Sequence, residues 1–132
     1  PPVIQMAALD AALDVFDGVE MKLLHDRSIT LSEKLRLGIA EACPALILAS
    51  PVDPRARGSQ ISFRHPQGYA IIQALIARNI IGDFRAPDIL RFGIAPLYVT
   101  EACVDRTIEA LSEIMAEDGW DRPEFHERAA VT

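Results

Sequence analysis

The segment between residues 57 and 98 constrains the fold more than any other part of the chain. Its apolar residues first alternate with polar ones, then recur at three- and four-residue steps, and then alternate again. The alternation predicts strands at Ile61–Arg64 and Ile89–Ile94, and a further short apolar run predicts a strand at Ile80–Phe84. The helical spacing predicts a helix over Gln67–Arg78. We therefore expect strand, helix, strand and strand in this order.

The flanking sequence predicts three more helices and one more strand. A first helix ends near Asp17, a second spans Val19–Cys43, and a short strand follows at Ala45–Ala49. Thr100 is expected to cap a last helix that Gly119 ends as the glycine just past its C-terminus. The residues expected to face inward are Met21, Leu24, Ser28, Leu31, Leu35 and Ile39 in the second helix, Tyr69, Ile72, Leu75 and Ile76 in the third, and Val104, Ile108, Leu111 and Met115 in the last. This order predicts an α+β fold, a small antiparallel or mixed sheet with helices packed on one face.

Composition indicates one compact domain. Half of the 132 residues are apolar and 24% are charged, which is enough for a core and argues against disorder. We expect the domain to span residues 1–120 and residues 121–132 to form a poorly ordered tail, because that tail is charged and lacks periodicity.

Net charge and the two cysteines limit the kinds of partner and the cellular compartment that we expect. The net charge of −6 argues against a nucleic-acid partner, and no apolar run is long enough to cross a bilayer. Cys43 and Cys103 are far apart and have no metal-binding or redox spacing, so we expect free thiols in a cytoplasmic protein and no metal site.

Arg91 is the residue hardest to explain by packing. Leu90, Phe92 and Ile94 alternate with Arg91 and Gly93, so the apolar set points one way and the arginine the other. Gly93 leaves room for a ligand or another backbone. From the residues alone, Arg91 is either a ligand-binding group or an exposed strand arginine in a surface ion pair.

A resemblance decides between these alternatives. The sequence SFRHPQGYAIIQALIARNIIGDFR, followed by LRFGIAPLY, resembles the C-terminal part of kynureninase. The resemblance implies the small domain of a fold-type-I, aminotransferase class V-like enzyme whose larger pyridoxal-phosphate (PLP) domain is absent from this chain. It implies a homodimeric hydrolase of tryptophan catabolism that cleaves L-kynurenine or 3-hydroxykynurenine to anthranilate, or its hydroxy derivative, and L-alanine. It also implies that Arg91 binds the α-carboxylate of this small amino-acid substrate.

The cofactor itself is expected to be held elsewhere. A lysine that joins PLP needs a lowered pKa, whereas Lys22 and Lys34 lie off the apolar stripe of the second helix and are expected on the surface. Gly58 stands alone and forms no glycine-rich phosphate loop. We expect no catalytic and no cofactor-binding residue in this chain, and no activity from it alone.

The other polar residues are weaker candidates. Arg64 shares a polar strand face and is a second, less favoured carboxylate ligand. His65 is expected to cap the strand-to-helix corner. The remaining candidates are expected to be solvated or to pack: Arg55, Arg57 and Arg85 in loops, His25 and His126 on the surface, and Tyr69 and Tyr98 through their rings.

Two rival functions remain open. The chain is alternatively the small domain of another class V aminotransferase-like enzyme, or a free-standing module that binds a carboxylate or dimerises without catalysis. A cysteine desulfurase is disfavoured, because Cys103 falls inside a predicted helix instead of a mobile loop. If a larger domain is missing, the apolar face formed by Leu9, Leu13 and Phe16 should be exposed and favour association.

Overall fold

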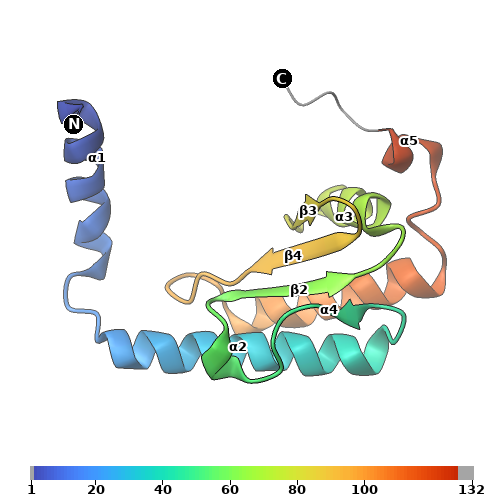
Figure 1. Ribbon diagram of the computed structural model, residues 1–132, viewed down its shortest axis with the longest axis horizontal. Coiled ribbons are helices and arrows are strands. Elements are labelled where there is room, and N and C mark those ends of the chain that lie inside the picture. Colours follow the sequence, from blue (N-terminus) through green and yellow to red (C-terminus); the bar gives the residue numbers. More distant parts are fainter. Residues whose placement is uncertain (1, 128–132) are drawn as a thin grey trace.

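The computed structural model describes residues 2–127, which form a small sheet covered on one face by helices (Figure 1). In chain order the elements are α1 (Val3–Leu13), the 3₁₀ turn η1 (Asp14–Phe16), α2 (Met21–Ala42), β1 (Ile47–Leu48), the 3₁₀ turn η2 (Pro54–Ala56), β2 (Gln60–Arg64), α3 (Gly68–Ile76), β3 (Asp83–Arg85), β4 (Ile89–Gly93), α4 (Glu101–Ala116) and α5 (Pro123–His126). The predicted α+β class is confirmed.

The sheet has four strands in the order β1-β2-β4-β3, and every neighbouring pair is antiparallel. The sheet is therefore purely antiparallel, the first of the two arrangements that the sequence allowed. Ile61 and Phe63 on β2 and Leu90 and Phe92 on β4 are buried. Because successive side chains of a strand point to opposite faces, these residues define one inner face, and the rings of Phe63 and Phe92 meet edge to face there.

Helix α2 covers this inner face together with α4. Its buried residues are Ser28, Leu31, Ser32, Leu35 and Ile39, whereas Met21 at its start is 61% exposed, so the predicted inward stripe was wrong at that end. A Cβ added at Gly38 would lie 2.3 Å from Cδ1 of Ile108 on α4. Glycine at this position lets α2 and α4 pack closely against each other beneath the inner face of the sheet.

Helix α3 ends in a compact hydrogen-bonded turn, and the next strand therefore begins later in the sequence than predicted. Asn79 adopts a left-handed conformation (φ 59°), and the N–H groups of Asn79 and Ile80 donate to the carbonyls of Ile76 and Leu75. These are the two bonds of a Schellman motif. Ile80 is thereby part of the helix end, so the strand predicted at Ile80–Phe84 begins only at Asp83. The predicted inner face of α3 also needs correction, since Ile76 is 40% exposed and Ile71 is buried.

Helix α4 also ends at a left-handed residue, with one of the two bonds of that motif. The N–H of Gly119 donates to the carbonyl of Ile114 at 2.8 Å, and the left-handed residue is Asp118 (φ 48°). Gly119 is therefore one position further from the helix than predicted. Thr100 caps the start of α4 as predicted, because its hydroxyl accepts a hydrogen bond from the N–H of Cys103.

The described part of the predicted tail, residues 121–127, contains a short helix. Pro123 opens α5, which packs against α3, and Phe125 is partly buried against the core. The Tyr69 hydroxyl donates to the carbonyl of Glu127 at 2.9 Å. A single apolar side chain within a charged segment has no periodicity, so the sequence pattern did not predict that Phe125 packs against the core. The rest of the predicted tail, residues 128–132, lies outside the described residues.

Helix α1 stands away from the rest of the molecule (Figure 1). None of its residues is buried, and Leu9, Leu13 and Phe16 are exposed, as the sequence predicted for a chain that lacks a larger partner. Across residues 2–127, no helix combines the length and apolar character needed to cross a membrane.

Candidate substrate-binding face

The outer face of the sheet carries the predicted binding residue. The strand register pairs Arg91 on β4 with Ser62 on β2 and with Asp83 on β3. Two positions along the strands, Ile89 pairs with Arg64 and with Arg85. The other outward positions of β2 and β4 are Gln60 and Gly93, which pair with each other. This face therefore holds three arginines and one carboxylate, an excess of positive charge on a chain whose net charge is −6.

Arg91 is held in place from one side by Asp83. Arg91 Nε donates to Asp83 Oδ2 at 2.6 Å, and Arg91 Nη2 donates to the same oxygen. The Arg91 side chain is 32% exposed and that of Asp83 is 57% exposed. An ion pair so open to water adds little to stability. Its main effect is to fix the orientation of the guanidinium.

The opposite edge of the guanidinium remains available. Arginine has five N–H donors, and the two bonds to Asp83 use Nε and one hydrogen of Nη2. Among the described residues, Nη1 has no hydrogen-bond acceptor, so the Nη1–Nη2 edge is left for a ligand. This edge matches the two oxygens of a carboxylate. A Cβ added at the neighbouring Gly93 would meet no atom within 4 Å, so the space beside Arg91 is open.

A glycine before β3 brings Asp83 to this position. A Cβ at Gly82 would lie 2.7 Å from Cδ1 of Ile72 on α3 and 3.2 Å from the ring of Phe92. A larger residue would push β3 away from α3 and from β4. The pairing of Asp83 with Arg91 was not predicted from the sequence, although Gly82 and Asp83 stand together in the GDF triplet ahead of the turn to β4.

The two lysines do not suit a covalent bond to PLP. Lys22 is 75% exposed and pairs with Asp26 at 2.6 Å. Lys34 differs from the prediction of plain surface, because it is half-buried and joins α2 to α4 through Asp105 at 2.8 Å and Glu101 at 3.1 Å. The hydrogen bonds that Lys34 donates to Asp105 and then to Glu101 raise the pKa of Lys34. A raised pKa keeps the amine protonated, the opposite of what a nucleophilic lysine requires.

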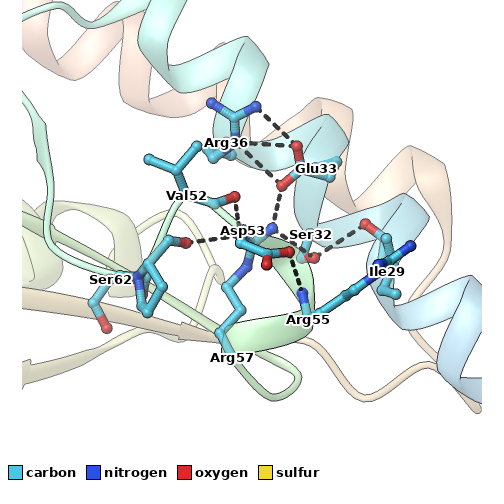
Figure 2. Close-up of polar contacts among 11 residues, drawn as sticks. Ile29, Ser32, Glu33, Arg36, Val52, Asp53, Arg55, Arg57 and Ser62 are labelled. Atoms are coloured by element: carbon cyan, nitrogen blue, oxygen red, sulfur yellow. Dashed lines mark hydrogen bonds and ion pairs between the residues drawn. The ribbon is translucent and has the colours of Figure 1, made fainter.

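Arg57, predicted to be a solvated loop residue, is buried instead. Its side chain is 4% exposed and points from the loop before β2 toward α2 (Figure 2). Nη1 donates to the carbonyls of Pro51 and Val52 at 2.8 and 2.9 Å, and Nη2 donates to Glu33. The guanidinium thus fastens the loop that connects β1 and β2 to the helix beneath the sheet. Arg85 also differs from the prediction, since it lies in β3 and not in a loop, while Arg55 is exposed as expected.

The network makes stability depend on the ionisation of Glu33. Hydrogen bonds from Arg36 lower the pKa of Glu33 most, Arg57 lowers it further, and burial opposes both. A folded-state pKa below the ordinary value of 4.5 means that the stabilisation is complete above that value and is lost as the pH falls through the folded pKa.

We therefore expect Glu33→Gln to lower the melting temperature near neutral pH and to lose this difference in acid. Melting curves of both proteins between about pH 7 and about pH 3 would test this, because other carboxylates titrate equally in both. Parallel pH profiles would contradict the role of Glu33.

The remaining candidates have structural contacts. His65 Nδ1 accepts a hydrogen bond from the N–H of Gln67 at 3.1 Å, a structural contact at the strand-to-helix corner, and burial lowers the pKa of His65. The ring of Tyr69 packs edge-on against Phe84. Tyr98 is 77% exposed. His25 is exposed, and His126 contacts Asp121. No group of three or more possible metal ligands is found within residues 2–127.

A separate pocket lies on the other side of β4. It has a volume of about 230 Å³ and is lined by residues that include Leu35, Phe92, Ile94, Cys103 and Thr107. From β4 its lining includes Phe92 and Gly93 but not Arg91. The hydrogen bond from Thr100 lowers the pKa of Cys103, whereas burial raises that of Cys43. The Arg91 face, the outer face of the sheet, is therefore distinct from this pocket.

Comparisons with known proteins identify the family of this chain. Residues 24–111 match the family "Kynureninase C-terminal domain". Kynureninases of Burkholderia mallei and Burkholderia pseudomallei are 41% identical over 133 residues, covering 99% of this chain and 32% of those proteins. The kynureninase of Pseudomonas fluorescens is 40% identical with the same coverage.

A solved structure extends the likeness to the fold. The lysine aminotransferase from M. tuberculosis in the internal aldimine form superposes with a TM-score of 0.56 and 26% identity, over 80% of this chain and 24% of that one. The present chain spans about a third of the length of its kynureninase relatives. It belongs to the kynureninase C-terminal domain family.

Proposed function

We propose that this chain is the C-terminal part of a PLP-dependent kynureninase, a homodimeric cytoplasmic enzyme of tryptophan catabolism. The intact enzyme would hydrolyse L-kynurenine or 3-hydroxykynurenine and release L-alanine, with anthranilate or its hydroxy derivative as the other product. In this proposal the larger domain supplies the cofactor and the lysine that holds it. The chain described here supplies substrate orientation.

The orientation of Arg91 carries this proposal. The guanidinium lies on a sheet face that no described helix covers, is fixed along one edge by Asp83, and presents the other edge to solvent. A fixed, planar fork binds a carboxylate through two charge-assisted bonds. Because those bonds fix the direction of the substrate relative to a rigid strand, they also orient the bonds to the α-carbon. The excess of arginines on this face favours an anionic ligand further.

The reaction assay is direct. The full-length protein with PLP should release anthranilate and L-alanine from L-kynurenine in equal amounts and without a keto-acid acceptor. Alanine formation that depends on a keto acid would instead indicate an aminotransferase, and no turnover of either kind would favour a binding module.

The isolated chain should form no specific covalent adduct with PLP. Lys22 is largely solvated and Lys34 is held protonated by two carboxylates, so neither amine is a good nucleophile. Borohydride reduction followed by peptide mapping should show weak labelling, reduced equally by Lys22→Arg and by Lys34→Arg. Stoichiometric labelling of either lysine would contradict the assignment of the cofactor site to the larger domain.

A further inference from the structure

The N-terminal part of the chain carries an unusual amount of exposed apolar surface. No residue of α1 is buried, and Val3 and Ile4 are 81% and 85% exposed. The exposed large apolar residues of this segment are Val3, Ile4, Met6, Leu9, Leu13, Val15, Phe16, Met21 and Leu23. Exposed apolar surface of this extent marks an interaction site.

The apolar residues of α1 surround the helix. Ile4 and Leu13 are nine residues apart, which is two and a half helical turns at about 3.6 residues per turn, so they lie on opposite sides. The one charged residue of α1 is Asp10. An amphipathic surface helix would keep one side polar, whereas a helix that is apolar all round is buried on all sides.

The family match indicates what buries it. Residues 1–23 lie before the segment that matches the C-terminal domain, yet the similarity to full-length kynureninases covers 99% of the chain. This chain spans only 32% of those proteins, and most of the remainder has no counterpart here. A second copy packed against α1 through a two-fold contact would cover one side and leave the other exposed.

We propose that α1 inserts into the larger domain of the intact protein and is enclosed there from both sides. This inference rests on the proposed function, since it requires that the larger domain exists. The helix leads through η1 and Gly18, which has a left-handed φ of 75°, into α2. Because α2 packs beneath the sheet that carries Arg91, docking of α1 would also hold the Arg91 face against the larger domain.

Hydrogen exchange and two charge substitutions test the proposal on the full-length protein, with the 132-residue chain for comparison. The amides of residues 3–16 should exchange at least about tenfold more slowly in the full-length protein. Ile4→Glu and Leu13→Glu should each lower its melting temperature by several degrees. Leu37→Glu is the matched control, because Leu37 on α2 is 56% exposed, close to the 54% of Leu13, and should cause little change.

The outcomes separate the possible occupants of the α1 surface. Equal exchange in both proteins, or sensitivity to Leu13→Glu but not to Ile4→Glu, would overturn enclosure by the larger domain. Protection of residues 3–16 that depends on protein concentration in the full-length protein would assign the surface to a second copy and overturn it as well. PLP binding and kynurenine cleavage, measured on the same full-length sample, report separately on the proposed function.

Discussion

Replacing Arg91 by alanine in the intact enzyme is expected to lower kcat/KM for L-kynurenine about a hundredfold. The Nη1–Nη2 edge can make two bonds to the substrate carboxylate, and at about 1.5 kcal/mol each their loss amounts to about 3 kcal/mol. Part of that loss is uniform binding and part is misorientation of the substrate. Both KM and kcat should therefore worsen in steady-state kinetics.

Two further variants define the geometry behind this effect. Arg91→Lys should recover little activity, because an ammonium cannot present two coplanar donors. Arg64→Ala is the matched control, since Arg64 lies on the same sheet face but pairs with Ile89 two positions away, and its effect should be mild. An Arg91→Ala enzyme within about threefold of the wild type would reduce Arg91 to the surface ion pair with Asp83.

The largest expected effect on folding comes from Arg57. Arg57→Ala should lower the free energy of unfolding by about 2 kcal/mol, because Glu33 loses one of its two charged donors and keeps only Arg36. The carbonyls of Pro51 and Val52 also lose their donor. Urea unfolding of the isolated chain, followed by circular dichroism, measures this change.

The neighbouring Arg55 provides the control. Its side chain is exposed and it lies in the same loop, so Arg55→Ala should change the free energy of unfolding by less than about 0.5 kcal/mol. Equal effects of Arg55→Ala and Arg57→Ala would show that the network between the loop and α2 contributes nothing specific.

The elements with a strong apolar period were predictable. Alternation in β2 and β4 placed Phe63 and Phe92 on the inner face, and helical spacing located the body of α2. The ends were less predictable, because they depend on local hydrogen bonds. Asn79 and Asp118 adopt left-handed conformations that draw the next residues into the helix ends, and neither residue type demands that conformation.

The site was predictable only in part. The alternation around Arg91 identified a polar side chain on the outer face of β4, and the sheet register agrees with it. The orientation of its guanidinium was not predictable, because it depends on the pairing of β3 with β4. Arg57 was misjudged for a related reason, since its partner Glu33 lies 24 residues earlier on a different element. Only the packed fold brings such residues together.

The pairing of Arg91 with the substrate carboxylate can be measured directly. Dissociation constants are compared for L-kynurenine-like inhibitors with and without the α-carboxylate, in the intact wild-type enzyme and in the Arg91→Ala variant. If Arg91 binds this group, removal of the carboxylate should weaken binding to the wild type about a hundredfold and leave binding to the variant nearly unchanged. An equal loss of affinity in both proteins would contradict the assignment and place the carboxylate on another group.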